Sequence, residues 1–256
     1  MEEYLIANYH THTVRCGHAQ GSERDYIESA IRAGIGTLGF SDHAPYCFAR
    51  PGYYSGWRME PGQASDYFAT LRALREEYRG RIRILIGLEM EYYPKSFAAT
   101  LDFVNRFAPD YLILGQHALS DEYDGVISYS PTDSEELLAQ YVNQVCDGLK
   151  TGKFLYLAHP DVFHFVGDDA VYRRHMGRLC RFCRESDLPL EINMLGIADK
   201  RHYPSERFFS IAGEEGCDAV IGVDAHQPEA LADVASYRAA CAMAQRCGLH
   251  IRRTLL

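Results

Sequence analysis

Residues 83–118, RILIGLEMEYYPKSFAATLDFVNRFAPDYLILGQHA, contain the pattern on which the predicted fold rests. Their first and last parts, 83–93 and 111–118, are short apolar runs with the length of a β-strand. The segment between them, 95–108, has the apolar spacing and the helix-forming residues of an amphipathic helix. A strand, a helix and a second strand in this order predict two parallel strands connected by a helix that covers the sheet.

The same alternation continues along the chain. Seven strand-like runs occupy residues 4–11, 37–44, 83–93, 111–118, 154–161, 188–194 and 219–226. Helical segments alternate with them at residues 22–35, 64–80, 95–108, 134–150, 169–186, 205–216 and 229–248. Seven near-continuous apolar strands suit a closed barrel better than an open sheet, so we predict an α/β fold with a TIM-like (β/α)7 barrel. No linker or low-complexity segment divides the chain, and we expect one domain over residues 1–256.

The composition excludes several classes of protein. Lys and Arg number 26 against 35 Asp and Glu, and the resulting charge of −9 disfavours binding to extended nucleic acid. No apolar run reaches the roughly eighteen residues of a membrane span, so we expect no membrane partner. The first residues lack the pattern of a secretory signal, which makes the cytoplasm the expected location.

The eight cysteines do not suggest a disulfide framework, because the chain is long and apolar enough to form a core without one. Cys180 and Cys183 have CxxC spacing, but no second pair lies at zinc-finger distance. We interpret them as packed thiols on one face of a helix.

Residues that can bind metals stand at the end of all seven strand-like runs. They are His10, His12, His43, Glu89, Glu91, His117, His159, Glu191, Asp224 and His226. Because the carboxyl ends of parallel barrel strands meet at one mouth, we expect one site to collect them. Residues two apart on a strand share a face, which favours joint binding by His10 with His12 and by Asp224 with His226.

Imidazole and carboxylate together suit Zn, Mn or Fe, and the histidines exceed what one tetrahedral ion needs. Two or three divalent metal ions are therefore predicted. A single strand-end histidine such as His117 or His159 is more often structural, and only the combined pattern favours metal binding. We interpret His175, His202 and His250 as solvated or packed, and His164, close to the predicted mouth, receives no assigned role.

The motifs YHTHT, CGHA, GFSDHAP, GLEMEY, GQHAL, AHPD, LEIN and GVDAH, in this order over residues 9–226, resemble those of the polymerase and histidinol phosphatase (PHP) family of metal-dependent phosphoesterases. The motif set and the length are most similar to the histidinol-phosphatase branch. This resemblance implies a distorted seven-stranded barrel and usually three metal ions.

Position by position, the resemblance implies three groups of metal ligands. The first is His10, His12, Glu89 and Asp224; the second is Glu89, His117 and His159; the third is His18, His43 and His226. Glu89 would bridge two ions, and Glu89, Asp224 and His226 are the predicted catalytic residues. Glu191, Asn193 and Asp42 are expected to support the ligands.

The implied activity is hydrolysis of a phosphomonoester, a small phosphorylated metabolite, and first of all histidinol phosphate in histidine biosynthesis. Divalent ions lower the pKa of a bound water and bind phosphoryl oxygens, so we predict in-line attack on phosphorus by a metal-bridging hydroxide without a phosphoenzyme. The alternatives are a phosphatase or phosphodiesterase of the same family that acts on another metabolite or on nucleotides, and a non-catalytic module that senses metal or phosphate.

An arginine is expected to bind the phosphate, because a guanidinium pairs with two phosphoryl oxygens. Arg201 is the first candidate, and Arg15, Arg50 and Arg58 are weaker ones. No Arg or Lys stands in VFHF after AHPD, where some relatives place a second cation. The aromatic loop 46–62 follows the second strand and is a candidate lid. Its residues Tyr46, Tyr53, Tyr54, Trp57 and Glu60 could receive an imidazole and an amine, or they could pack the loop.

Overall fold

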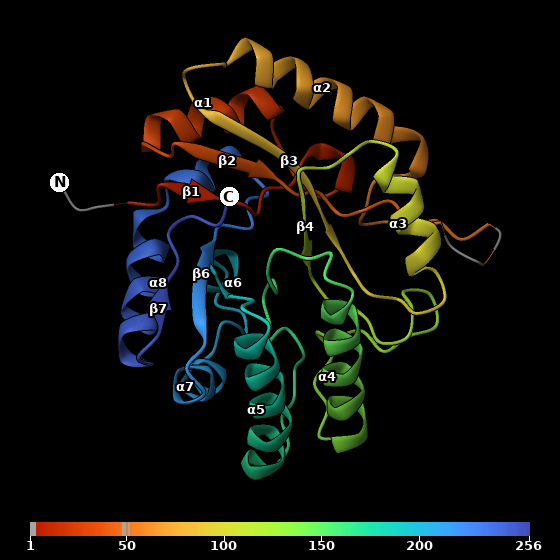
Figure 1. Cartoon of the computed structure of the whole chain (residues 1–256), viewed down its shortest axis with the longest axis vertical. Helices are drawn as coiled ribbons and strands as arrows, with labels where there is room; N and C mark the ends of the chain where they lie inside the picture. Colours follow the sequence, from red (N-terminus) through yellow and green to blue (C-terminus); the bar gives the residue numbers. More distant parts are fainter. Residues whose placement is uncertain (1–3, 48–49, 51) are drawn as a thin grey trace.

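The sheet of the protein is parallel throughout and lies in two parts (Figure 1). The structure, a computed structural model, describes residues 4–47, 50 and 52–256. One part has the order β1 (Ala7–Asn8), β2 (Thr37–Phe40), β3 (Arg83–Met90) and β4 (Tyr111–Leu114). The other has the order β5 (Leu190–Asn193), β6 (Asp218–Gly222) and β7 (His250–Ile251).

Backbone bridges close the two parts into a barrel. Leu157 bridges to Leu114 of β4 on one side and to Leu190 of β5 on the other. At the opposite seam Thr11 bridges to Ala225, whose carbonyl accepts a hydrogen bond from His12 N at 2.9 Å. The predicted TIM-like distorted barrel is confirmed. The distortion lies at the fifth predicted strand, 154–161, which pairs with its neighbours through single bridges only.

Strand β7 is not predicted from the sequence. It pairs with the beginning of β6, where Asp218 lies opposite His250. Its two residues are too few to show a period of two, which is the signal by which a strand is found.

Helices cover the outer face of the curled sheet (Figure 1). They are α1 (Glu23–Ala33), α2 (Ala64–Glu77), α3 (Phe97–Asn105), α4 (Glu135–Lys150), α5 (Asp169–Glu185), α6 (Met194–Ala198), α7 (Glu206–Glu214) and α8 (Val234–Arg246). Three 3₁₀ turns accompany them: η1 (Val14–Cys16), η2 (Pro61–Gln63) and η3 (Pro228–Ala232). No helix in the described ranges is both long and apolar enough to cross a membrane.

The expected helices form where the sequence places them, with two differences. The segment 229–248 begins as η3, and α8 starts only at Val234, because the Asp233 side chain accepts a hydrogen bond from Ser236 N and caps the helix there. The short α6 is not predicted; it follows β5 directly and is capped by the Asn193 side chain. Cys180 and Cys183 are both fully buried on α5, as packed thiols would be.

Buried apolar side chains form two layers, one between the sheet and the helices and one inside the barrel. On β3, Ile84, Ile86 and Leu88 face the helices, whereas Leu85 packs inside the barrel. Since side chains alternate along a strand, Glu89 also points inward. It is the last inward-facing residue of β3 before the mouth of the barrel. The interior layer below it consists of Ala7, Tyr9, Leu85, Tyr111, Ile113, Tyr156, Ala158 and Val220.

Tyr111 fills the middle of this layer. Its hydroxyl donates to Tyr9 O at 2.7 Å and to Phe40 O at 3.1 Å, so one side chain ties three strands together. Gly87 on the neighbouring strand leaves room for the ring: a Cβ there would lie 2.7 Å from the Tyr111 ring and 2.6 Å from Tyr111 O. The interior is therefore a packed floor and not a channel.

Gly87→Ala should lower the free energy of unfolding by about 1–3 kcal/mol, because the added methyl group overlaps backbone and ring atoms of Tyr111 that cannot move away. Urea unfolding followed by circular dichroism measures the change. Gly62→Ala is the control, since a Cβ at Gly62 would meet no atom within 4 Å. Equal unfolding midpoints for both variants would contradict this description of the barrel floor.

Candidate metal centre

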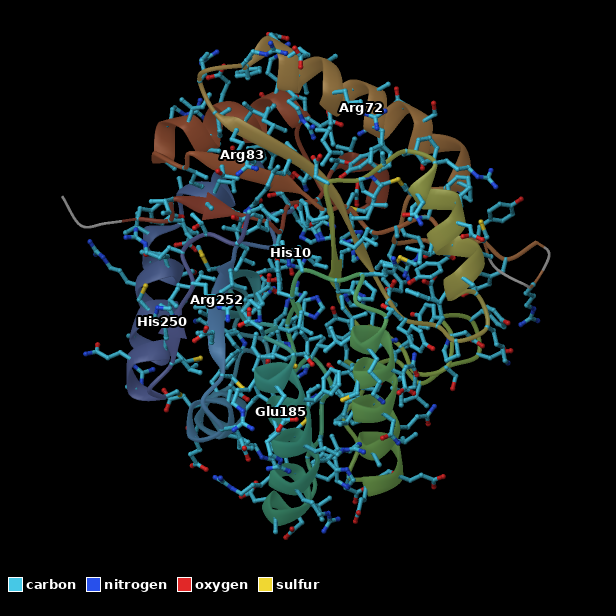
Figure 2. The ribbon with its side chains drawn as sticks, in the orientation of Figure 1. His10, Arg72, Arg83, Glu185, His250 and Arg252 are labelled. Carbon is cyan, nitrogen blue, oxygen red and sulfur yellow. The ribbon has the colours of Figure 1, made fainter. Side chains whose placement is uncertain are left out.

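The nine predicted ligands come together at the mouth of the barrel, and Figure 2 places His10 near the centre of the molecule and His250 at its edge. Glu89 lies in the middle of the group and is 1% exposed. Its Oε1 is 2.8 Å from His159 Nε2 and 3.4 Å from His117 Nε2. Its Oε2 is 2.9 Å from His43 Nδ1, 3.6 Å from His10 Nε2 and 3.7 Å from His12 Nε2.

Asp224 forms the second centre of negative charge. Its Oδ1 lies 3.0 Å from His12 Nε2 and 3.4 Å from His10 Nε2. The residue has a φ of 54°, and His159 has a φ of 27°, in the region that residues other than glycine seldom adopt. Such strain persists where the surrounding structure enforces it, which is common at functional sites.

The two pairs that the sequence predicts to act together do meet, since His10 and His12 both approach Asp224 Oδ1, but they do not lie on regular strands. Strand β1 ends at Asn8 and β6 at Gly222, so both pairs, His10 with His12 and Asp224 with His226, lie beyond regular strands. The Asn8 side chain explains the change at β1: it donates to Thr11 Oγ1 at 2.8 Å and accepts from Val223 N at 2.9 Å. It thereby bends the chain and ties it to the end of β6.

His18 and His226 provide the clearest sign that a cation fits here. Their Nε2 atoms are 3.0 Å apart. Each ring donates its Nδ1–H to a backbone carbonyl, His18 to Cys16 O and His226 to Asp224 O, both at 3.0 Å. Burial lowers the pKa of both, that of His226 to about 3, so both rings are neutral near pH 7. Two nitrogen lone pairs then face each other, an arrangement that a shared cation relieves.

Unpartnered buried atoms support the same conclusion. In the described part of the chain, the buried side-chain atoms without a hydrogen-bond partner include His10 Nε2, both nitrogens of His12, His43 Nδ1, Glu89 Oε2 and Asp224 Oδ1. A buried polar atom without a partner is costly, and such atoms rarely cluster. Imidazole nitrogens and carboxylate oxygens in one cluster are the donor set of Zn, Mn or Fe. The residues present therefore fit divalent cations.

A ring of carboxylates and one amide orients the histidines, and it includes the groups predicted to support them. Glu191 Oε1 lies 2.8 Å from His10 Nδ1, and its Oε2 accepts from Asn193 Nδ2 at 2.9 Å. Asn193 also donates to Asp224 Oδ2 at 3.1 Å. Asp42 Oδ1 is 3.5 Å from His12 Nδ1. The Glu191 contact occupies Nδ1 of His10 and leaves its Nε2 toward the centre, whereas Asp42 only lies near His12 Nδ1.

Glu91 has a different place from the one that the sequence suggests. As a strand-end residue it was a candidate ligand, but β3 ends at Met90 and the carboxylate turns away from the centre. It lies 2.8 Å from His117 Nδ1 and pairs with the buried Arg58. Nothing in the sequence of the aromatic loop indicates that Arg58 pairs with Glu91. The sequence makes Arg58 only a weaker candidate for phosphate binding.

A cavity of about 490 Å³ opens over the centre. Arg201 lines it, together with Glu89, Asp224 and five of the predicted metal-binding histidines, His18, His43, His117, His159 and His226. The three weaker candidates for phosphate binding, Arg15, Arg50 and Arg58, are not among its described lining residues. Arg15 is held by ion pairs with Glu23 and Asp66, and Arg50 lies 3.3 Å from Asp124 on the surface.

Some aromatic residues of the loop 46–62 lie near the centre and others lie away from it. Residues 48, 49 and 51 of this predicted lid lie outside the described residues. Trp57 lines an adjoining cavity of about 320 Å³ with Ile127 and Tyr129. Tyr46 is buried, whereas Tyr54 is exposed, and neither lines the cavity over the centre.

Metal binding should release protons at neutral pH. Burial opposes a charge on His10 and His12, but Asp224 and the neighbouring carboxylates raise the pKa of both, that of His12 to about 9. Both rings therefore hold protons near pH 7 without a cation, and a cation must displace them. Calorimetric titration with Zn²⁺ in buffers of different ionisation enthalpy should show more protons released at about pH 7 than at about pH 10, and an affinity that rises over this interval. A heat independent of the buffer at pH 7 would contradict the assignment.

Known proteins with the same fold and similar sequences share this arrangement of the chain. The crystal structure of histidinol phosphate phosphatase from Lactococcus lactis subsp. lactis, complexed with zinc, L-histidinol and phosphate, matches with a TM-score of 0.74 and 21% identity over 97% of this chain and 96% of that one. The probable histidinol-phosphatase of Deinococcus radiodurans is 31% identical over 235 residues, 87% of either chain. The histidinol-phosphatase of Bacillus subtilis is 29% identical over 85% of this chain and 92% of its own.

The family model of the PHP domain matches residues 8–194, which include the first HxH pair, Glu89, His117 and His159. Asp224 and His226 lie beyond the match and reach the same centre through β6. From this match over most of its length, we conclude that the chain belongs to the PHP domain family.

Proposed function

We propose that the protein is a metal-dependent phosphomonoesterase that hydrolyses histidinol phosphate to histidinol and phosphate in histidine biosynthesis. The observation that carries the proposal is the cluster of imidazoles around Glu89 beneath a small-molecule cavity with a guanidinium on its wall. The names of the relatives from D. radiodurans and B. subtilis support the substrate. So does the L. lactis structure, which contains zinc, L-histidinol and phosphate.

Three groups of residues are proposed to hold the ions, in the sets that the sequence predicts. The ligand atoms of His10, His12 and Asp224 lie within 4.8 Å of one another, and so do those of His18, His43 and His226. The group around Glu89 and His159 completes the centre, with His117 beside it. When bound, the ions would supply positive charge for the phosphoryl oxygens and a water of lowered pKa.

The side chains keep the charge that such a site requires. Burial alone would raise the pKa of Glu89, but His117, His43 and His10 hold it well below the usual carboxyl range. The pKa of Asp224 is lowered in the same way by His10, His12 and His226 against the effect of burial. Both therefore stay ionised and can hold cations at neutral pH.

Among the described residues that line the cavity, none is Ser, Thr or Cys, and Tyr129 carries the one hydroxyl group. Burial raises the pKa of Tyr129 well above its ordinary value, so it remains a protonated phenol near pH 7. Cys16 lies close to His12 and His226, but burial and Asp42 raise its pKa to about 12, so it remains a thiol. These features support direct attack by water on the phosphorus atom.

The cavity also has the charges that histidinol phosphate requires. Arg201 is the one Arg or Lys among its described lining residues, and it suits the phosphate. Its guanidinium donates to Tyr203 Oη at 2.8 Å and to Asp199 Oδ2 at 2.7 Å, which orient it at the rim. Asp199, Glu229 and Asp233 line the cavity as well and suit a substrate that carries an amine.

The proposal is tested with Zn²⁺-reconstituted protein and three substrates: histidinol phosphate, p-nitrophenyl phosphate and bis(p-nitrophenyl) phosphate. We expect kcat/KM for histidinol phosphate to exceed that for the generic monoester by about 10²-fold or more, because the cavity has partners for the amine. The diester should be inert. Preferential cleavage of the diester would favour the phosphodiesterase alternative, and three inert substrates with bound metal would favour the sensing module.

Arg201→Ala should lower kcat/KM for histidinol phosphate by about 10–10²-fold, the loss expected for one charge-assisted contact to phosphate. Arg201→Lys should recover part of it, because an ammonium keeps the charge but not the paired donors. Steady-state kinetics measure both. Arg184→Ala on the outer face of α5 is the control. If Arg201→Ala behaves like this control, another group binds the phosphate.

A further inference from the structure

We propose that Arg58 is a positioning residue for the metal ligand His117, and that it acts through Glu91. The inference rests on the proposed metal centre and concerns a residue that does not touch the cavity over it. Arg58 is 4% exposed, and its partners Glu91 and Glu122 are 0% and 5% exposed. An arginine buried to this degree requires partners that compensate for the loss of water around its charge.

All three nitrogens of the Arg58 guanidinium make hydrogen bonds, and two carboxylates accept most of them. Nη2 lies 2.7 Å from Glu91 Oε1 and Nη1 lies 3.1 Å from Glu91 Oε2, a paired contact. Nε donates to Glu122 Oε2 at 2.7 Å, and Nη1 also donates to Ala44 O at 3.0 Å. Lysine has one charged nitrogen and cannot make this set of contacts.

Glu91, held by Arg58, in turn fixes the position of the His117 ring. Its Oε1 accepts a hydrogen bond from His117 Nδ1 at 2.8 Å while Arg58 holds the same oxygen. A carboxylate only accepts, so the hydrogen is on Nδ1 and the lone pair is on Nε2, which lies 3.4 Å from Glu89 Oε1. A carboxylate behind a ligating imidazole fixes the ring and makes its other nitrogen a better donor.

The charges of this group favour the same role. One guanidinium faces two carboxylates, so a net negative charge remains beside His117 Nδ1. Without Arg58 the two buried carboxylates would have no cation between them, and Glu91 would lose the contact that holds it in place.

Arg58 also joins the ligand to the loop that follows β2. The Trp57 ring centroid lies 4.2 Å from the guanidinium carbon and the Tyr46 centroid 4.7 Å from it. Trp57 in turn packs edge-on against the rings of His43 and His117, with centroids 5.2 Å apart in both pairs. Trp57 thus joins the two histidines to the guanidinium of Arg58.

The test uses Arg58→Lys and Arg58→Met in the full-length protein. Zn²⁺ affinity is measured by competition with a chelator, and the ring NH of His117 is followed by NMR in the Zn²⁺-loaded protein. We expect one class of bound Zn²⁺ to weaken by about 10–100-fold in Arg58→Met and less in Arg58→Lys, the range for loss of a group behind a ligand. The His117 Nδ1–H should exchange faster with solvent in both.

Arg207→Lys is the matched control. Arg207, like Arg58, is held by carboxylate and carbonyl oxygens, here one carboxylate and two carbonyls, and lies 4.0 Å from the Tyr172 ring, but its partners include no proposed metal ligand. The Arg207→Lys substitution should lower the thermal stability of the protein and leave its Zn²⁺ affinity unchanged. If folded Arg58 variants bind Zn²⁺ like the wild type and keep the His117 signal, Arg58 is only a structural brace and the inference is wrong.

Glu122→Gln covers the case in which Arg58→Met does not fold. Glu122 touches Arg58 but not His117, so this variant should weaken the same class of Zn²⁺ by a smaller factor. An unchanged affinity in both Glu122→Gln and Arg58→Lys overturns the inference. An inert wild-type enzyme that binds Zn²⁺ would instead refute the proposed substrate and leave the role of Arg58 intact.

Discussion

The buried carboxylate of Glu89, enclosed by imidazoles, is the constraint on which the rest of the structure depends. A charge at 1% exposure is tolerated only if positive charge or hydrogen-bond donors surround it. The histidines around it are themselves buried and must satisfy their second nitrogen. Glu191, Glu91 and Asp42 lie beside those second nitrogens, and the backbone carbonyls of Cys16 and Asp224 accept from two more. The outer groups therefore determine which nitrogens face the centre and could bind cations.

The barrel provides the rigidity that such a cluster needs. Below the centre, Tyr111 and its apolar neighbours fill the interior, so the carboxylates rest on a packed floor. Above it, Glu89 is the last inward-facing residue of β3, whereas the histidines and Asp224 lie beyond the ends of regular strands, and Asp224 and His159 have a positive φ. The Thr11–Ala225 bridge and the hydrogen bonds of Asn8 hold the segments after β1 and β6 together, so that His10, His12 and Asp224 meet.

Charge is distributed so that an acidic protein can receive an anion. The chain carries a formal charge of −9, and the cavity has carboxylates at its rim. Arg201 and the cations that fit the centre would supply the positive charge at the point where a phosphate is proposed to bind. Arg58, in contrast, is neutralised inside the protein by Glu91 and Glu122. Arg201 lines the cavity and pairs with one carboxylate, that of Asp199, whereas Arg58 is buried between two carboxylates and does not line the cavity.

The sequence by itself determined the alternation of strands and helices, the closed barrel and the metal-binding residue types at the strand ends, because each depends on near neighbours and on the shared direction of parallel strands. The set of nine residues, with His18 among them, followed from the resemblance of the motifs to the PHP family. Only the tertiary structure decided that β1 and β6 end before their ligands, that Arg15 and Arg50 lie away from the cavity, and that Glu91 turns to Arg58. Glu91 and Arg58 are 33 residues apart, and Arg58 and Glu122 are 64 apart. Contacts over such distances leave no period in the sequence, since they depend on how loops pack once the barrel has closed.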